Sequence, residues 1–386
     1  LRRGRGAIVL VPEISLTPQT VERFVGRFGR ERIAVLHSHL SNGERHDEWH
    51  RIRDGKADIV IGARSAVFAP VKDLGLIVVD EEHEPSYKQE EAPRYNARDI
   101  AVLRGKLQNC AVMLGSATPS LESWHNVRIG KYRRSVLSHR ADNRRMPAMR
   151  IVDMRIETER TGHVSILSRD LAEAIKQRLN RAEQTILFLN RRGFSTSLVC
   201  PKCGFVARCK LCSVSFTYHR STEELRCHLC GAREKVPPKC PGCGDPAFKF
   251  AGIGTQRVET IVAKFFPHAR IQRMDADVTT QKESYDRILG AFRTGKTDIL
   301  IGTQMIAKGL HFPNVTLVGV IYADLSLHMP DFRAGERTFQ LLAQVAGRAG
   351  RGDVHGEVIV QTYTPFNLAI QAARRLDYEG FCDQEI

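Results

Sequence analysis

The sequence predicts an α/β protein of two lobes, each built on a parallel sheet, with a small cysteine-rich insertion in the second lobe. A chain of 386 residues is too long to fold around a single core. The segment RDGKADIVIGA at 53–63 recurs as RTGKTDILIGT at 293–303, each time after a helix-like stretch and before a strand. In each half, an apolar strand beyond the repeat ends near an acid, Asp80 or Asp324. This recurrence predicts two similar lobes.

The boundaries between these parts follow from composition. We expect the first lobe at residues 1–138 and a polar, arginine-rich linker at 139–164. The second lobe is expected in two segments, 165–199 and 245–386, which flank the insertion at 200–244.

The chain carries a large positive charge, formally +15 from 58 basic and 43 acidic residues. This surplus favours a polyanionic partner, and nucleic acid before a membrane surface because no basic amphipathic stretch stands out. No apolar run approaches the length that spans a bilayer.

In the first lobe, the apolar run Leu76–Val79 leads directly into Asp80-Glu81-Glu82-His83. A buried parallel strand that ends in adjacent carboxylates delivers acids to the carboxyl edge of a sheet. Enzymes that hydrolyse nucleotides use one such carboxylate to hold Mg²⁺ through its waters and another to orient the attacking water. A strand that runs into a solvated acidic turn gives the same pattern, so these residues alone leave both interpretations open.

The insertion contains eight of the ten cysteines as four C-x-x-C pairs: Cys200/Cys203, Cys209/Cys212, Cys227/Cys230 and Cys240/Cys243. This spacing predicts two structural Zn²⁺ sites with four thiolates each. A disulfide framework would need an oxidising compartment, which nothing in the sequence indicates. We expect a nested arrangement, with the outer two pairs on one ion and the inner two on the other, although spacing also permits an interleaved one.

A second pattern in the chain is misleading. The segment GAFRTGKT at 290–297 matches the phosphate-loop pattern G-x-x-x-x-G-K-[ST]. A working loop follows a strand and opens a helix, so that the helix amides face the phosphates. Here the pattern closes a helix and enters the strand Ile299–Ile301, so it is not expected to bind phosphate.

Several strand exits carry small polar residues, among them GARSA at 62–66, GSATP at 115–119 and GTQ at 302–304. Ligands of open sheets bind at such exits, although turns also use these residues for conformational reasons. The segment QVAGRAGR at 344–351 is more informative. It places two arginines three apart on an expected helix, where guanidinium groups suit the charge on a transferring phosphoryl group.

Taken in order, these motifs resemble superfamily 2 helicases, whose two RecA-like lobes clamp ATP between them. The resemblance is closer still to the bacterial replication-restart helicases and covers essentially the whole chain. It rests on DEEH, GSATP, the paired cysteines and further segments: LHSHLSNGER (36–45), IGARSAVFAP (61–70), SYKQEEAPRYNARD (86–99), GTQMIAKG (302–309), PDFRAGERTFQLLAQVAGRAGR (330–351) and DYEGF (377–381).

The resemblance implies roles where residues match. Asp80 resembles the carboxylate that coordinates Mg²⁺ with ATP, and Glu81 the residue that orients water. In the second lobe, Gln344 would lie beside the nucleotide, and Arg348 and Arg351 would act as arginine fingers.

Further matched residues imply coupling and DNA contacts. Ser116 and Thr118 would couple hydrolysis to lobe movement. The expected contacts to the DNA backbone are Arg64, Ser65, Thr303 and Gln304. The loop at 86–99 would offer stacking and phosphate contacts to single strands through Tyr87, Lys88, Arg94 and Tyr95. Without the resemblance, a solvated surface loop explains the same residues.

The family implies an ATP-dependent 3′→5′ DNA helicase with two structural Zn²⁺ ions and Mg²⁺ with ATP. Its partners would be forked or single-stranded DNA, primosome proteins and single-strand-binding proteins, and no membrane, in a cytoplasmic, nucleoid-associated protein. In the family, a phosphate loop lies just upstream of the position of Leu1, so we expect a helicase-core fragment that hydrolyses ATP poorly by itself.

Two other functions stay open. The first is a zinc-bearing module that docks DNA and primosome proteins without hydrolysing ATP, against which Glu81, Arg348 and Arg351 argue. The second is an RNA helicase, against which the cysteine insertion argues.

Overall fold

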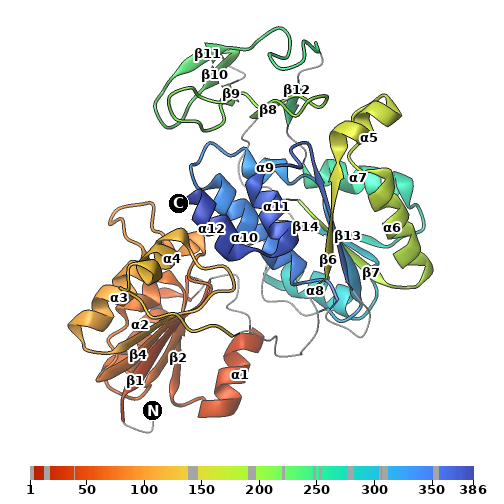
Figure 1. The fold of residues 1–386 in the computed structure, drawn as a ribbon. Coiled ribbons are helices and arrows are strands. Elements are labelled where there is room, and N and C mark those ends of the chain that lie inside the picture. The colour runs from red at the N-terminus through yellow and green to blue at the C-terminus, as the bar shows by residue number, and fades with distance from the viewer. Residues whose placement is uncertain are drawn as a thin grey trace. The chain divides into compact units, whose positions relative to one another are not determined.

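The computed structural model describes residues 4–12, 18–38, 40–137, 147–189, 197–219, 222–246, 249–251, 254–275, 282–303, 306, 312–350 and 356–386. The chain divides into two compact units, Leu1–Arg134 and Ser135–Ile386. In Figure 1 the first unit runs from red to orange and the second from yellow to blue.

The first unit is built on a five-stranded, fully parallel sheet in the order β2-β3-β1-β4-β5. Its strands are β1 (Gly6–Leu10), β2 (Ile33–Leu36), β3 (Ile59–Gly62), β4 (Leu74–Val79) and β5 (Ala111–Leu114). Its helices are α1 (Pro18–Phe28), α2 (Asn42–Arg53), α3 (Ala97–Leu107) and α4 (Leu121–Arg128), with the 3₁₀ turns η2 (Arg64–Phe68) and η3 (Pro85–Tyr87).

The second unit is built on a six-stranded parallel sheet in the order β13-β14-β7-β15-β16-β6. Its strands are β6 (Ala148–Asp153), β7 (Gln184–Phe188), β13 (Ile271–Met274), β14 (Ile299–Gly302), β15 (Val315–Val320) and β16 (Glu357–Thr362). Its helices are α5 (Met154–Thr161), α6 (Arg169–Asn180), α7 (Thr255–Phe265), α8 (Lys282–Arg293), α9 (Asp324–Leu327), α10 (Ala334–Ala346), α11 (Leu368–Arg375) and α12 (Tyr378–Glu385). The predicted pair of parallel-sheet lobes is confirmed.

The two sheets share one topology, as the repeated segment predicted. Strand β1 lies at the centre of the first sheet, and β7 holds the equivalent place in the second. The strand of the repeated segment pairs with this strand in each lobe, β3 with β1 and β14 with β7. The repeat also carries an equivalent ion pair. Arg32, which precedes β2, pairs with Asp58, and Arg270, which precedes β13, pairs with Asp298. Both pairs join the amino-terminal ends of two adjacent strands.

A glycine ends the repeated strand in both lobes for the same reason. A Cβ on Gly62 would lie 2.5 Å from the carbonyl oxygen of Leu36 in the neighbouring strand. A Cβ on Gly302 would lie 2.8 Å from the carbonyl oxygen of Met274, in the equivalent neighbour. Backbone atoms cannot yield to such a contact as a flexible side chain can, so both strand exits require a residue without a side chain.

The segment that was predicted to be a linker at 139–164 contains regular structure. Strand β6 pairs with β16 in parallel over six residues, from Ala148 to Asp153, and forms an edge of the second sheet. Helix α5 follows at once, capped by the Asp153 carboxylate. The polar composition of this segment suits an edge strand with exposed positions as well as it suits a linker. The second lobe therefore begins before residue 165.

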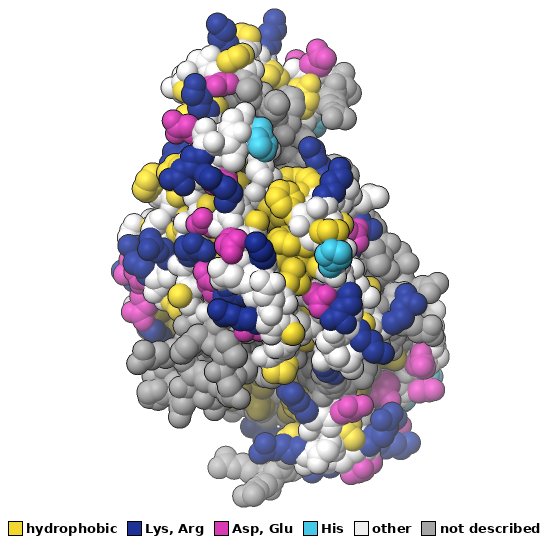
Figure 2. All heavy atoms as spheres, turned by 90° about the vertical axis from the view of Figure 1, so that its right-hand side faces the viewer, with side chains coloured by type: hydrophobic (Ala, Val, Ile, Leu, Met, Phe, Trp, Pro, Cys, Tyr) yellow, Lys and Arg dark blue, Asp and Glu magenta, His cyan; other side chains and the backbone are white. Residues whose placement is uncertain are grey.

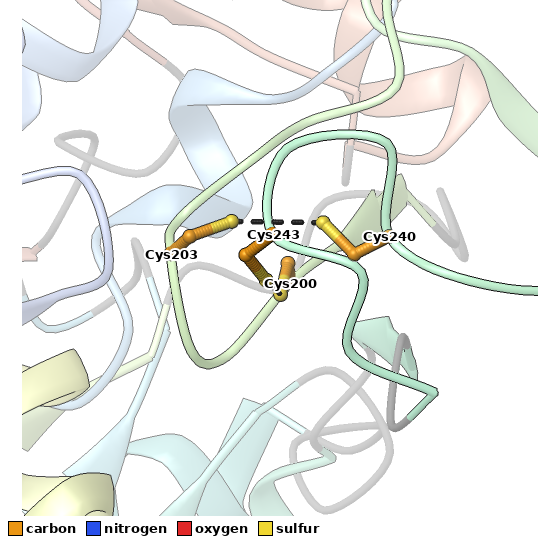
Figure 3. A group of neighbouring side chains, drawn as sticks. All are labelled: Cys200, Cys203, Cys240 and Cys243. Carbon is orange, nitrogen blue, oxygen red and sulfur yellow. Dashed lines mark hydrogen bonds between the residues drawn. The ribbon is translucent and has the colours of Figure 1, made fainter.

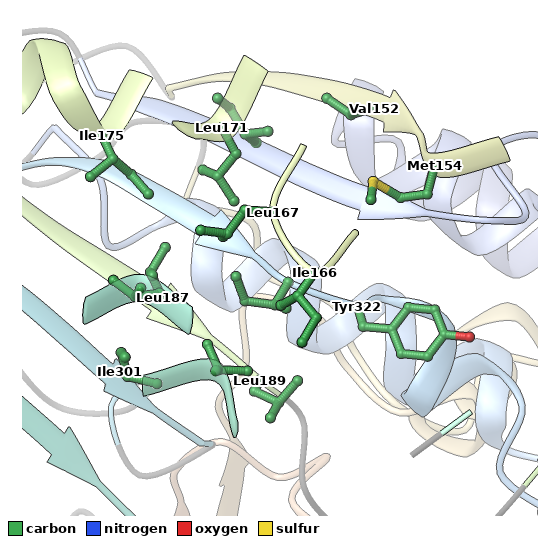
Figure 4. Packing of buried hydrophobic residues seen from close by; sticks show 14 of the residues in the cluster. Val152, Met154, Ile166, Leu167, Leu171, Ile175, Leu187, Leu189, Ile301 and Tyr322 are labelled. Atoms are coloured by element: carbon green, nitrogen blue, oxygen red, sulfur yellow. The ribbon is translucent and has the colours of Figure 1, made fainter. Parts of the chain in front are cut away.

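Each lobe has its own apolar core. In the first unit, buried residues from β1, β2, β3 and β4, with partly buried residues of β5, meet the inner faces of α2 and α3. In the second unit, Leu171 and Ile175 of α6 pack on Leu187 and Ile301 of the sheet, as Figure 4 shows. Two separate cores agree with the expectation that one core would not suffice for this length.

The cysteine-rich insertion forms a small module within the second unit. Strand β8 (Ser197–Val199) pairs antiparallel with β12 (Lys249–Ala251), which brings the two ends of the insertion together. Between them, β9 (Thr217–His219), β10 (Glu224–Arg226) and β11 (Arg233–Lys235) form an antiparallel sheet. Its core is small, with Leu198, Phe216 and Leu225 as its most buried large side chains. The Ser197 hydroxyl donates to the His328 carbonyl oxygen at 2.7 Å and so fixes the module to the end of α9.

Basic and acidic side chains are mixed on the face drawn in Figure 2. On the face drawn in Figure 2, lysine and arginine side chains are spread among acidic ones and do not form a single patch. Among the described residues, no helix combines the length and the apolar character that crossing a bilayer requires.

Candidate functional site

The acidic turn at Asp80 lies at the carboxyl edge of the first sheet, as predicted. Asp80 directly follows β4, and its backbone N–H donates to the Leu10 carbonyl oxygen of β1 at 2.9 Å. The next residue, Glu81, has a φ of 46°, in the left-handed region. Non-glycine residues seldom adopt this conformation, and functional sites are where it recurs. The Glu81 N–H donates to Asp80 Oδ1 at 3.0 Å, so the turn orients the first carboxylate.

The Asp80 side chain is accessible from solvent, yet the protein around its carboxylate affects its protonation. Burial raises the pKa of Asp80, and the hydrogen bond from the Glu81 amide lowers it by a smaller amount. A divalent cation would oppose this shift, because a cation stabilises the ionised carboxylate. Asp80 therefore presents an accessible carboxylate at this edge of the sheet.

Glu82 anchors the turn from inside. Its side chain is only 3% exposed. Oε1 accepts from the Ser120 backbone N–H at 2.7 Å, and Oε2 accepts from the Ser120 hydroxyl at 3.1 Å. Oε2 also accepts from Arg98 Nη1 at 3.2 Å. Because Ser120 caps α4 and Arg98 lies in the first turn of α3, this carboxylate joins three segments.

The sequence did not predict a role for Glu82, Arg98 or Ser120. The DEEH motif predicts roles for its first two acids, Asp80 and Glu81. Glu82 instead bonds to residues 16 and 38 positions away in the sequence. A local pattern cannot reveal such long-range bonds. The Ser-x-x-Ser start of α4 was the available indication that Ser120 caps a helix.

His83 connects the acidic turn to the GSATP segment. Its side chain is 2% exposed, and its Nδ1 lies 2.7 Å from the Ser116 hydroxyl oxygen. That oxygen accepts from the Thr118 backbone N–H at 2.9 Å. The two predicted coupling residues, Ser116 and Thr118, thus lie in one hydrogen-bonded turn in contact with the DEEH motif. Their coupling role stays a prediction.

The loop that follows corrects one predicted DNA contact. Tyr87 is 1% exposed, and its hydroxyl donates to the Asp80 carbonyl oxygen at 2.7 Å. Burial raises the pKa of this phenol well above its usual range, so the hydroxyl stays protonated and donates. A ring inside the core cannot stack on a base, because both of its faces are already covered. Tyr87 therefore supports the acidic turn, and sequence alone did not show its burial.

The other predicted contacts of this loop stay accessible. Lys88 and Arg94 are exposed, and Tyr95 is half-buried. Arg64, which follows β3, donates from Nη1 to the Lys88 carbonyl oxygen at 2.8 Å and so ties the strand exit to the loop. Its neighbour Ser65 is exposed.

In the second unit the predicted residues lie on two elements. Thr303 directly follows β14, at the exit equivalent to that of Arg64 in the first lobe. Gln344 lies near the end of α10 and is half-buried. Gln304 and Arg351 lie outside the described residues.

Arg348 corrects the helical interpretation of its segment. Helix α10 ends at Ala346, and the Arg348 N–H donates to the Val345 carbonyl oxygen in the turn that follows. Gly347 caps the helix, and Gly350 has a φ of 68°, which a helix does not contain. Two glycines in this short stretch end the helix because they favour a cap. The arginine is therefore presented by a turn.

The apparent phosphate loop closes a helix, as predicted. Residues 290–293 are the last of α8, and β14 begins at Ile299. Gly295, with a φ of 73°, forms the turn between them. The amides of a helix N-terminus are therefore not available at this pattern.

The eight paired cysteines form two groups of four in the nested arrangement that was predicted. Cys200, Cys203, Cys240 and Cys243 form one group, in which two loops face each other as drawn in Figure 3, and Cys209, Cys212, Cys227 and Cys230 form the other. Within each group the sulfur atoms lie within 4.8 Å of one another.

The sulfur spacing fits zinc and not disulfides. The Sγ–Sγ distances are 3.7 Å for Cys200 and Cys243 and 3.6 Å for Cys209 and Cys230. Four sulfurs around zinc, with Zn–S bonds of about 2.3 Å, are about 3.8 Å apart, whereas disulfide sulfurs are about 2.05 Å apart. The groups therefore suit two structural zinc ions.

Three family models match separate parts of the chain. The DEAD/DEAH box helicase model matches residues 1–127, and the helicase conserved C-terminal domain matches 253–353. The PriA DNA helicase Cys-rich region domain matches 209–235, inside the zinc module.

Curated relatives match the chain over its whole length. The replication restart protein PriA of Bacillus subtilis (strain 168) is 53% identical over 386 residues, which cover 100% of this chain and 48% of that protein. The PriA protein of Chlamydia trachomatis is 47% identical, and the alignment covers 99% of this chain and 51% of that protein. The PriA protein of Synechocystis is 46% identical, and the alignment covers 100% of this chain and 47% of that protein. The chain thus spans about half the length of these relatives.

Solved structures share the fold at low sequence identity. RecG bound to a three-way DNA junction aligns with a TM-score of 0.51 at 17% identity, over 99% of this chain and 40% of that one. The DUF1998 helicase MrfA bound to DNA and AMPPNP aligns with a TM-score of 0.50 at 14% identity, and the alignment covers 99% of this chain and 44% of that one. These likenesses support the arrangement of each lobe as a helicase fold.

Proposed function

The chain belongs to the family of the replication restart protein PriA, and we propose on that basis that it is the helicase core of an ATP-dependent 3′→5′ DNA helicase acting in replication restart. The observation that carries the proposal is the turn at Asp80, where a strained Glu81 and an accessible carboxylate stand at the carboxyl edge of a parallel sheet. Ligands of such sheets bind at this edge.

Asp80 and Glu81 have different proposed roles at this edge, metal binding and water orientation. Asp80 would hold Mg²⁺ with ATP, which neutralises charge on the phosphates during transfer. Glu81 would orient the attacking water from the next position along the turn, where its backbone has a φ of 46°. Glu82 and Tyr87 keep the turn rigid, through the bonds to Ser120 and to the Asp80 carbonyl oxygen. A rigid turn positions a water without reorganisation during the reaction.

The second lobe contributes charge-stabilising groups. Gln344 and Arg348 lie four residues apart, at the end of α10 and in the turn beyond it. Arg348, together with Arg351, would act as an arginine finger on the transferring phosphoryl group. Ser116, bonded to His83, and Thr118, whose N–H donates to the Ser116 hydroxyl oxygen, would transmit the state of the acidic turn to the rest of the first lobe.

DNA is the proposed substrate, forked or single-stranded. Contacts to its backbone are proposed for Arg64, Ser65, Thr303 and Gln304, and contacts from the loop for Lys88, Arg94 and Tyr95. The net charge of +15 supports a polyanionic partner. The zinc module offers a surface for primosome proteins and single-strand-binding proteins, which we propose as partners.

The test is DNA-stimulated ATP hydrolysis, measured on the chain extended upstream until it includes a phosphate-binding loop. Glu81→Gln should lower kcat by at least about a hundredfold while nucleotide binding persists, because removing a water-orienting group acts on the transition state. Equal rates would contradict the role of Glu81. If the unsubstituted extended chain binds DNA and hydrolyses no ATP, the docking-module alternative replaces the proposal.

A further inference from the structure

Phe68, at the end of η2, is an exposed aromatic residue without a role in the proposed ATP hydrolysis or DNA contacts. Its side chain is 48% exposed, although it lies only three residues beyond Ser65 at a strand exit proposed to contact DNA. The Tyr95 ring meets it edge-on, with ring centroids 5.1 Å apart and an interplanar angle of 73°. Tyr95 itself packs against the core of the first lobe, so it anchors the pair.

The backbone on both sides of Phe68 is fixed. Arg104 of α3 donates from Nη1 to the Val67 carbonyl oxygen at 2.5 Å and from Nη2 to the Ala69 carbonyl oxygen at 2.9 Å. Val67 and Ala69 are completely buried. Phe68 is therefore the exposed residue between two buried ones, on a backbone that one guanidinium group holds at both ends. Its exposure is built into the fold and is not the result of a loose loop.

Cationic side chains lie on the loop that carries Tyr95. The Gln89 N–H donates to the Tyr95 carbonyl oxygen at 2.7 Å, and Lys88 bridges Asn96, so the two arms of the loop run side by side. Lys88 at the start of this loop is exposed. Arg64 joins η2 to the same loop through the Lys88 carbonyl oxygen. An aromatic pair and an exposed cation are thus held in one rigid region.

We propose that Phe68, supported by Tyr95, stacks on an unpaired base of single-stranded DNA. This deepens the proposed function and rests on it, because it names where a base is held while cations of the loop take the phosphates. Aromatic stacking contributes about 1–3 kcal/mol per base and depends little on base identity. A rigid ring is ordered before the base arrives, so little conformational entropy is lost on binding.

The experiment measures binding of a fluorescent oligothymidine to the zinc-loaded chain by anisotropy. Phe68→Ala should weaken binding by between about fivefold and a hundredfold, the range that corresponds to one stacked base. Phe68→Trp should bind as tightly as the unsubstituted chain, because it keeps an aromatic face. Phe68→Leu should bind as weakly as Phe68→Ala, because it keeps only the apolar volume. The matched control is Phe265→Ala on α7, where a phenylalanine of similar exposure, 55%, should be dispensable.

Salt dependence separates stacking from charge. The slope of log affinity against log salt should be unchanged in Phe68→Ala, and smaller by about one in Lys88→Ala, which removes a phosphate contact. Unaltered affinity in Phe68→Ala, equal affinity of Phe68→Leu and Phe68→Trp, or a reduced slope in Phe68→Ala would each overturn the inference while the proposed function stands. Failure of the unsubstituted chain to bind any single-stranded DNA would remove the inference and the proposed DNA contacts together.

Discussion

At the scale of single residues, the buried carboxylates do more for the structure than their motifs suggest. Glu82 accepts hydrogen bonds from a helix cap and from Arg98, and Asp324 accepts them from the Tyr363 amide and the hydroxyls of Thr362 and Thr364. Both side chains are almost completely buried. A buried charge is tolerated only where such partners surround it.

Replacing Glu82 should destabilise the first unit. We expect Glu82→Ala to lower the free energy of unfolding by about 2–4 kcal/mol, because Arg98 and the Ser120 amide lose a buried partner. Both tryptophans, Trp49 and Trp124, lie in the first unit, so tryptophan fluorescence during denaturant unfolding reports on that unit alone. Asp99→Asn is the matched control. It removes another carboxylate that pairs with Arg98. Because the Asp99 side chain is 64% exposed, the change should alter stability by no more than about 0.5 kcal/mol. Equal effects of the two substitutions would refute the anchoring role.

Asp324 should make the stability of the second unit depend on acid pH. Burial raises its pKa, but His328 and the bonds from Thr364 and Tyr363 outweigh burial, so its pKa in the folded state lies below the ordinary value. A carboxyl with a lowered folded pKa contributes stability above its unfolded pKa of about 4 and loses it as pH falls through the folded value. Asp324→Asn should therefore cost about 1–3 kcal/mol near neutral pH, and the difference should shrink below about pH 4. Unfolding followed by circular dichroism at several pH values measures this, and a difference independent of pH would contradict it.

At the scale of elements, the duplicated strand-and-turn unit explains what could be predicted. The repeat at 53–63 and 293–303 contains the same glycine exit and the aspartate of the same ion pair in both lobes, so the topology followed from the sequence. The cysteine spacing led to the nested zinc groups in the same way. What could not be predicted depends on contacts between distant segments: the burial of Tyr87 and the edge strand β6.

The fold of the zinc module should depend on its metal ions. The chain should contain two zinc ions, and Cys212→Ser should leave one, because the two groups share no ligand. Removing both ions with a chelator should unfold the module while tryptophan fluorescence of the first unit stays constant, because that unit has its own core.

Elemental analysis counts the ions. Cys110→Ser is the control, since Cys110 belongs to neither group and should leave two ions bound. Fewer than two ions in the unsubstituted chain, or loss of both in Cys212→Ser, would contradict separate sites.

At the scale of the whole molecule, the two lobes divide the proposed chemistry between similar folds. The first lobe supplies the acidic turn, the contacts of Ser116 and the aromatic pair, and the second supplies Gln344, Arg348 and the zinc module. The two strand exits, at Arg64 and Thr303, hold equivalent places in their lobes. In the proposed function, both exits would contact the DNA backbone.

The most direct test of the account is strand separation by the chain extended upstream to include a phosphate-binding loop. A short duplex with a 3′ single-stranded tail and one with a 5′ tail are compared, with and without ATP and Mg²⁺, for the unsubstituted protein and for Glu81→Gln. The account predicts ATP-dependent unwinding of the 3′-tailed duplex, little unwinding of the 5′-tailed one, and none by Glu81→Gln. Absence of unwinding by a protein that binds the DNA, or equal unwinding by Glu81→Gln, would contradict it.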